Sequence, residues 1–99
     1  MSESPIPGLR AVDHVAVTVP DLEQAIDFFT EVVGGEHVYT TGEFADDAGD
    51  WMYTNINVHP RSRLRIGMVR LGAHTNLELM EYRAPDQEKD HPRNSDIGA

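Results

Sequence analysis

The most constraining feature of this sequence is a change of hydrophobic period near residue 20. Residues 11–19 read AVDHVAVTV, in which β-branched residues alternate with others, as they do along a strand. A proline ends this run, and Asp21 with Gln24 three residues later matches a helix cap. Two glycines stop the helical pattern, whose apolar stripe is formed by Leu22, Ala25, Ile26, Phe29, Val32 and Val33. The segment therefore predicts a strand followed directly by a helix.

The rest of the chain reads as further strands separated by turns. Residues 36–44 predict a second strand, and residues 64–71 and 76–82 predict a closing hairpin around Gly72. Residues 51–58 alternate in character, which is compatible with an extension of the second strand or with a strand of their own. An order of strand, helix and three strands predicts an α+β domain, a βαβββ module whose mixed sheet carries one helix on one face.

Side-chain parity assigns the strand residues to two faces of this sheet. Successive side chains of a strand point to opposite sides, so one set is expected to pack under the helix, namely Val15, Val17, Val19, Leu77 and Leu79. The other set would project away from the helix and comprises His14, Ala16, Thr18, Glu78, Met80 and Tyr82. Because no second helix is predicted, this opposite face is expected to be open.

Composition narrows the class of protein. The chain has 99 residues and no cysteine, so any metal must be held by histidine and carboxylate. Its formal net charge of −9 disfavours nucleic acid and anionic lipid as partners. No apolar run is long enough for a membrane span or a secretory signal, which predicts a cytoplasmic protein. Residues 1–82 are predicted to form the module, and residues 83–99 a polar tail or linker.

Two stretches of the sequence resemble a known family. The run DHVAVTVPDLEQAIDFFTEVVGGE and the run LRIGMVRLGAHTNLELMEYRAP are similar to the opening and the closing hairpin of a module of the vicinal oxygen chelate superfamily. That superfamily includes glyoxalases, bleomycin resistance proteins and extradiol dioxygenases. The resemblance implies that this chain is the first βαβββ module, half of the usual fold, and that a second module would follow the tail.

The resemblance also implies a metal site. In the family, the histidine of the first strand and the glutamate of the last strand's ELxEY-like segment bind the metal, and these positions are His14 and Glu78 here. The ion would be Zn²⁺, Ni²⁺, Mn²⁺ or Fe²⁺, since imidazole and carboxylate suit all four. Glu78 would double as a catalytic base. Two ligands form half a site, so a second module, or a second copy in a homodimer, would supply the other half.

Other residues are weighed against this assignment. A histidine in a sheet is often only hydrogen-bonded to a neighbour, which is the alternative for His14. Glu81 is the second candidate carboxylate, but parity places it on the helix side near the strand end, where a surface capping role is favoured. The remaining histidines are expected to be solvated (His37, His59, His74 and His91), and the acidic loop is expected to be a solvated turn (Glu43, Asp46, Asp47 and Asp50). Five side chains would line a ligand pocket or belong to the core or an interface: Trp51, Tyr53, Met68, Met80 and Tyr82.

Three functions are compatible with these residues. The first is a metal-dependent enzyme of lyase, isomerase or epimerase type, whose ion binds vicinal oxygens of a small substrate and stabilises an enolate-like intermediate. The second is a non-catalytic drug-binding module of the bleomycin-resistance type, for which an acidic, aromatic-lined cleft would suit a cationic ligand. The third is an inactive half-module whose open face is covered only by self-association.

Overall fold

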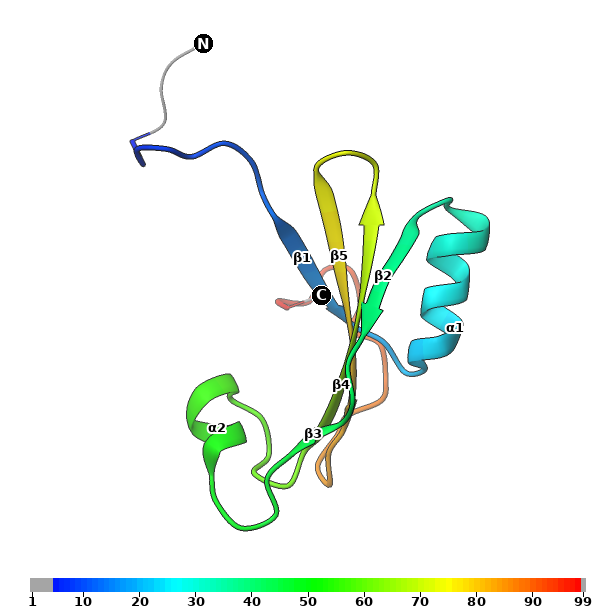
Figure 1. Ribbon diagram of the computed structural model, residues 1–99. Coiled ribbons are helices and arrows are strands. Elements are labelled where there is room, and N and C mark those ends of the chain that lie inside the picture. The colour runs from blue at the N-terminus through cyan, green and yellow to red at the C-terminus, as the bar shows by residue number, and fades with distance from the viewer. Residues whose placement is uncertain (1–4, 99) are drawn as a thin grey trace.

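The computed structural model describes residues 5–98 and contains a mixed sheet with helices on both sides (Figure 1). The sheet order is β1-β5-β4-β2, with β3 also paired to β4. Strand β1 runs parallel to β5, and the other pairs are antiparallel. This confirms the predicted single α+β module. The elements are β1 (His14–Thr18), α1 (Leu22–Asp27), a π-helical continuation η1 (Phe28–Val32), β2 (Glu36–Thr40), β3 (Phe44–Ala45), α2 (Trp51–Ile56), β4 (Arg63–Leu71) and β5 (Thr75–Arg83).

Helix α1 begins at the predicted cap. The Asp21 carboxylate accepts a hydrogen bond from the backbone N–H of Gln24 at 3.0 Å, which satisfies one of the free donors of the first turn. The helix then widens into η1, where the N–H of Val33 donates to the carbonyl of Phe28, five residues earlier. The helical segment is therefore continuous to Val32, but its second half is a π-helix, and the last two residues of the predicted stripe, Val32 and Val33, are 72% and 50% exposed.

The core lies between α1 and the central strands β4 and β5. Its buried members are Leu22, Val69, Leu77 and Leu79. At Gly67 of β4 the helix comes so close that a Cβ would lie 3.0 Å from Ile26 Cδ1 and 3.2 Å from Leu22 Cδ1, so a side chain there would require these two side chains to shift. The helix thus sits directly over the middle of the sheet.

The expected packing of β1 under the helix is only partly right. Val19 packs against the core, but Val15 and Val17 are 53% and 43% exposed. Both share the helix-side face with Leu77 and Leu79, their partners in the β1–β5 register. They are exposed because α1 covers β4 and β5, while β1 is the edge strand beyond them.

The predicted second strand is divided in two. Pairing of β2 with β4 is irregular between His37 and Tyr39 and ends at Thr40, and β3 resumes pairing with β4 at Phe44. Between them Thr41 still pairs with β4, because its N–H donates to the Ile66 carbonyl at 2.8 Å and its hydroxyl accepts from the Ile66 N–H at 3.0 Å. A side chain thus replaces one backbone acceptor of the ladder, and the regular strand stops there.

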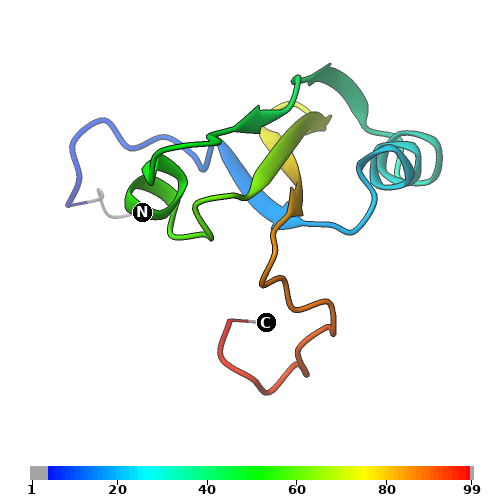
Figure 2. The same cartoon turned by 90° about the horizontal axis from the view of Figure 1, so that it is seen from below.

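The prediction of an extended segment at residues 51–58 is wrong, because the structure has the short helix α2 there. The Asp46 carboxylate accepts from the N–H groups of Ala48 and Gly49, and the Arg61 guanidinium donates to the carbonyls of Asp46 and Gly49. These contacts fix the turn before the helix, and Met52 is buried. Helix α2 lies on the side of the sheet opposite α1, next to the end of the sheet near β3 (Figures 1 and 2), and it does not pack over the strands as α1 does.

Beyond β5 the chain leaves the sheet, and residues 84–98 contain no helix or strand (Figure 2). Residues 1–4 of the predicted module and residue 99 of the predicted tail lie outside the described residues. Within residues 5–98, no helix has the length and apolar character that crossing a bilayer requires.

Candidate functional site

His14 and Glu78 meet on the sheet face opposite α1, here called the open face. They come from the neighbouring parallel strands β1 and β5, in which Glu78 is the register partner of Ala16, two residues beyond His14 on the same face. His14 Nε2 lies 3.7 Å from Glu78 Oε2, and the two side chains are 45% and 20% exposed. Parity in the sequence therefore led to the correct face for both residues.

Asp13 holds the other side of the His14 ring. Its Oδ2 lies 2.8 Å from His14 Nδ1, and because a carboxylate can only accept, Nδ1 carries the hydrogen. The Asp13 carbonyl in turn accepts from the Asn76 backbone N–H at 3.2 Å and side-chain amide at 3.1 Å, which ties this residue to β5. The hydrogen bond to Asp13 raises the pKa of His14, and the nearby charge of Glu78 adds to the effect. No pattern in the sequence indicated this contact between Asp13 and His14.

This geometry fits a divalent cation. In a neutral ring with hydrogen on Nδ1, the Nε2 lone pair faces the Glu78 carboxylate, so two acceptors face each other and require a proton or a cation between them. Two atoms that each lie about 2.1 Å from an ion are about 3.0 to 3.4 Å apart. The observed 3.7 Å therefore needs only a small movement of two partly exposed side chains.

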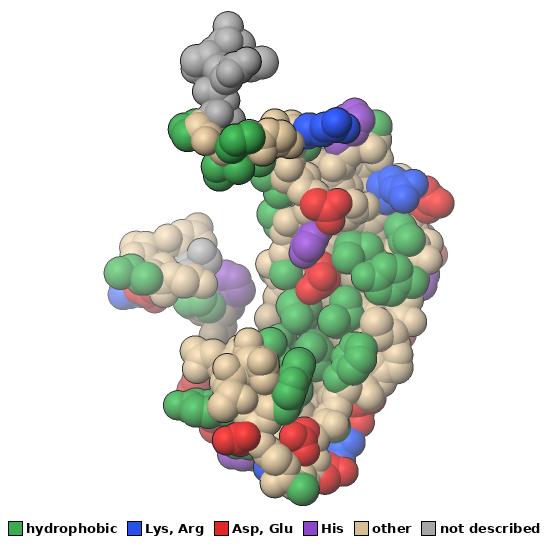
Figure 3. Space-filling model, turned by 60° about the vertical axis from the view of Figure 1, so that its left-hand side comes forward, with side chains coloured by type: hydrophobic (Ala, Val, Ile, Leu, Met, Phe, Trp, Pro, Cys, Tyr) green, Lys and Arg blue, Asp and Glu red, His purple; other side chains and the backbone are tan. Residues whose placement is uncertain are grey.

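Hydrophobic side chains gather on the open face next to this pair (Figure 3). Met68 and Met80 lie on this face of β4 and β5 and are half-buried, as is Tyr82. Burial raises the pKa of Tyr82, and the charge of Glu78 raises it further. Trp51 and Tyr53 are on α2, where they are 56% and 59% exposed. The five predicted pocket residues thus fall into a sheet group and a helix group.

A cavity of about 740 Å³ lies where these two groups approach each other. Its walls come from β1, the end of β5, α2, the loop after α2 and the first residues of the tail. Of the predicted pocket residues, Tyr53 and Tyr82 line it. His59 also lines it and is half-buried, which corrects the expectation of a solvated role. His59 Nδ1 accepts a hydrogen bond from the Arg61 N–H at 3.0 Å.

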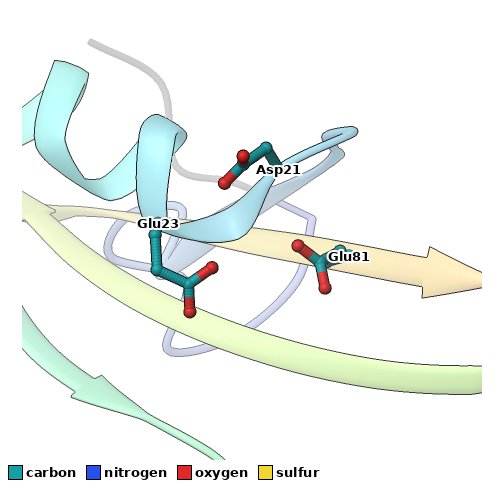
Figure 4. A group of neighbouring side chains, drawn as sticks. All are labelled: Asp21, Glu23 and Glu81. Atoms are coloured by element: carbon teal, nitrogen blue, oxygen red, sulfur yellow. The ribbon is translucent and has the colours of Figure 1, made fainter.

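A second group of carboxylates lies on the helix side of the sheet (Figure 4), formed by Asp21, Glu23 and Glu81. Glu81 was expected at the surface, but it is only 7% exposed. Its Oε2 accepts a hydrogen bond from the Leu22 N–H at 2.7 Å. Arg65 contacts both Glu23, at 2.5 Å, and Glu81, at 3.8 Å. Since Asp21 caps α1, each of the three carboxylates already has a donor of its own. The group therefore serves to attach the start of α1 to the sheet.

The chain has relatives among known proteins. The chain is 58% identical over 93 residues to a 2-epi-5-epi-valiolone epimerase of Actinomyces sp, a match that covers 94% of this chain and 50% of the epimerase. It is 34% identical over 55 residues to a manganese-dependent 2,3-dihydroxybiphenyl 1,2-dioxygenase of Geobacillus genomosp. 3, covering 54% of this chain and 18% of the dioxygenase. The chain therefore spans half or less of these relatives.

The fold has a counterpart among solved structures. The crystal structure of a glyoxalase family protein from Bacillus cereus superposes with a TM-score of 0.65 at 23% identity, over 95% of this chain and 60% of that one. Residues 11–98 match the model of the family described as the glyoxalase/bleomycin resistance protein/dioxygenase superfamily. This match covers all the helices and strands described above. The chain belongs to the glyoxalase/bleomycin resistance protein/dioxygenase superfamily.

Proposed function

We propose that this chain is one module of a metal-dependent epimerase that acts on a small polyhydroxylated ketone. The observation that carries the proposal is the facing pair of His14 Nε2 and Glu78 Oε2, with Asp13 fixing the ring from behind. The 58% identity to a 2-epi-5-epi-valiolone epimerase supports the reaction type. The manganese dependence of the dioxygenase relative supports a divalent ion held by nitrogen and oxygen.

In this proposal His14 and Glu78 are the module's metal ligands. His14 would bind through Nε2, because its Nδ1 hydrogen is engaged by Asp13. Glu78 would bind through a carboxylate oxygen, and its 20% exposure leaves that oxygen reachable from the open face. A bound ion would act as a Lewis acid toward vicinal oxygens of the substrate, which makes the adjacent carbon a stronger acid.

Glu78 is also the proposed base. Epimerisation next to a carbonyl removes the proton from a carbon on one face and returns a proton to that carbon on the opposite face. One Glu78 carboxylate would accept the first proton. The return from the other side requires a second acid, which the matching glutamate of a facing module would provide. The hydrophobic neighbours Met68 and Met80 would keep water away from the reacting carbon.

A complete site therefore requires a partner module. Two protein ligands leave most positions of a four- to six-coordinate ion open. A second copy related by twofold symmetry would add another histidine and another glutamate and would cover the hydrophobic open face. We thus propose a homodimer of this chain with one ion per two chains.

A drug-binding module is the second candidate. One observation favours it: no lysine or arginine lines the cavity, while Asp86 and Glu88 do. With a formal net charge of −9, such a surface attracts a cationic ligand. In that case the chain would bind its ligand equally well in the presence of a chelator.

The test combines the solution mass of the protein with its metal content. The protein is purified with Mn²⁺, and both quantities are measured for the parent chain and for His14→Ala and Glu78→Ala. His37→Ala is the matched control, since His37 is exposed and bonded to Thr40. The proposal predicts a dimer with one ion per two chains, lost in the two site variants and kept in the control. A monomer without metal in the parent chain would contradict it.

The reaction is tested separately by incubating the metal-loaded protein with 2-epi-5-epi-valiolone in D₂O. Epimerisation with deuterium incorporation at the inverted carbon is expected from the parent chain and not from Glu78→Ala. Metal uptake without any exchange would leave a metal-binding module and exclude catalysis by this chain.

A further inference from the structure

Ser62 carries a buried polar group that the fold leaves without a partner. The residue is fully buried, and its Oγ has no hydrogen-bond partner among the described residues. Its backbone is satisfied differently, because the Ser62 N–H donates to the His59 carbonyl at 2.9 Å. An unpaired buried hydroxyl has lost its hydrogen bonds to water without replacement and destabilises the fold, so its presence calls for an explanation. Ser62 is also one of the residues that line the cavity of about 740 Å³.

We propose that this cavity binds an uncharged polyhydroxylated group and that Ser62 is one of its hydrogen-bonding partners. The wall offers groups that donate and accept: the hydroxyls of Thr18, Tyr53 and Tyr82, and the amides of Asn57 and Gln87. Hydroxyl groups of a ligand also do both, so they match such a wall better than a group that only donates or only accepts. An apolar ligand would leave these polar groups without partners.

The charges around the cavity decide between ligand classes. Among the described residues no lysine or arginine lines it, His59 is its one imidazole, and the two acidic residues, Asp86 and Glu88, are exposed. An anion would be repelled by them. A cation would be drawn to the exposed rim, where water screens the attraction, and could use the Ser62 hydroxyl only as an acceptor. A neutral ligand is the class that uses the buried part of the wall.

The position of the cavity relates it to the metal-binding pair. Thr18 lies on the open face of β1, four residues beyond His14. Tyr82 lies on the same face of β5, four residues beyond Glu78. Four residues of strand span about 13 Å, so the cavity is a separate compartment further along the same face. The hydroxyl groups would belong either to the substrate itself or to a second ligand. Only the assignment to the substrate rests on the proposed function.

The test is a titration with myo-inositol, followed by the backbone amide signals of the ¹⁵N-labelled chain with EDTA present. Saturable shifts are expected at residues of the cavity wall. Ser62→Ala should weaken the affinity about tenfold while leaving the unfolding midpoint equal or higher, since it removes an unpaired buried hydroxyl. Asn57→Gly is the second variant, because its positive φ of 57° suits glycine and the fold should tolerate it. It should also weaken binding.

Ser95→Ala, an exposed serine of the tail, is the matched control and should bind myo-inositol as the parent does. Tetramethylammonium and sulfate serve as cationic and anionic probes. Unchanged affinity in Ser62→Ala, or tighter binding of tetramethylammonium than of myo-inositol, would overturn the proposal. Metal uptake without inositol binding would remove this inference alone, whereas inositol binding without metal uptake would remove the proposed function alone.

Repeating the titration with metal-loaded protein separates the two sources of the hydroxyl groups. If they belong to the substrate, 2-epi-5-epi-valiolone should displace myo-inositol from the loaded protein. If they belong to a second ligand, both molecules should bind at once.

Discussion

Glu78 and Glu81 lie three residues apart on β5 and have opposite surroundings. Glu81 faces α1, is 7% exposed, and accepts the Leu22 N–H while two arginines lie within 4 Å of its other oxygen. Glu78 faces away from α1, and its one ion-pair partner within 4 Å among the described residues is His14, which is positive only when it is protonated. The first carboxylate has its donors within the fold. The second has room for a further positive group, which is what a metal-binding carboxylate requires.

A carboxylate that the fold itself uses differs in its surroundings from the one proposed to bind a metal. A buried carboxylate is tolerated when hydrogen bonds and opposite charges compensate the lost hydration. Glu81 meets this condition through the first turn of α1 and through Arg65 and Arg83. Glu78 meets it only if the acceptor facing it, His14 Nε2, is protonated or shares a cation with it. Opposite effects of substitution are therefore expected at the two positions.

The largest effect is expected for Glu78→Ala. Mutation of a residue that only orients a metal ligand typically reduces metal affinity about 10–100-fold. Removal of a side chain that itself binds the metal should therefore reduce the affinity by more than about 100-fold. The free energy of unfolding of the metal-free protein should hardly change, because the fold does not use this carboxylate. Affinity is measured by calorimetric titration with Mn²⁺. If Glu78→Ala retained parent affinity, the open face would not be the metal site.

Glu81→Ala should do the reverse. It leaves the buried N–H of Leu22 without an acceptor, and we expect unfolding to become easier by about 2 kcal/mol, a factor of about 30 in the folding equilibrium. Glu81→Gln keeps a neutral acceptor and should recover part of this loss. Urea unfolding of the metal-free protein at one fixed concentration measures both variants. Equal stability of Glu81→Ala and the parent would remove the distinction between the two glutamates.

Much of the fold followed from local pattern. The strand-to-helix switch at Asp21 and the closing hairpin are encoded by period and by cap residues, so β1, α1, β4 and β5 were predicted to within a few residues. Helix α2 was missed because six residues are too few for a clear helical period, and because the turn that starts it is fixed by Arg61, a residue beyond the helix. The exposure of Val15 and Val17 depends on where α1 crosses the sheet, which parity does not specify.

The candidate site was predictable only in part, for related reasons. Parity and family resemblance together place His14 and Glu78 on one face, and the structure brings them within 3.7 Å. Their role as metal ligands stays a prediction. Asp13 was missed because adjacent residues of an ideal strand point apart, and its contact with His14 depends on Asp13 preceding the first residue of β1. Ser62 was missed because a lone serine in a loop carries no pattern that indicates burial, and serines are mostly exposed.

The third largest effect is expected for substitution of Asp13. It tests whether Asp13 orients the His14 ring for metal binding, a role that none of the described residues has for Glu81. Asp13→Ala removes the acceptor of His14 Nδ1, and metal affinity should fall about tenfold, the lower end for a second-layer residue, since Asp13 is 83% exposed. Asp13→Asn keeps an oxygen acceptor and should restore most of it. The ring tautomer of His14, measured by ¹⁵N NMR, should become mixed in Asp13→Ala. A fixed tautomer in that variant would show that Asp13 does not orient the ring.

The smallest effect is expected at Glu23, and it tests the helix-side group. The hydrogen bond from Arg65 lowers the pKa of Glu23 below its ordinary value. A carboxylate with a lowered folded-state pKa stabilises the fold above the unfolded pKa of about 4.3 and loses that contribution as the pH falls through the folded value. The stability difference between the parent and Glu23→Gln should therefore be greatest near neutral pH and shrink below about pH 4.3. Thermal unfolding of both proteins across this range measures it. A difference that did not shrink would mean that the charge of Glu23, and therefore its ion pair with Arg65, is not what stabilises the fold.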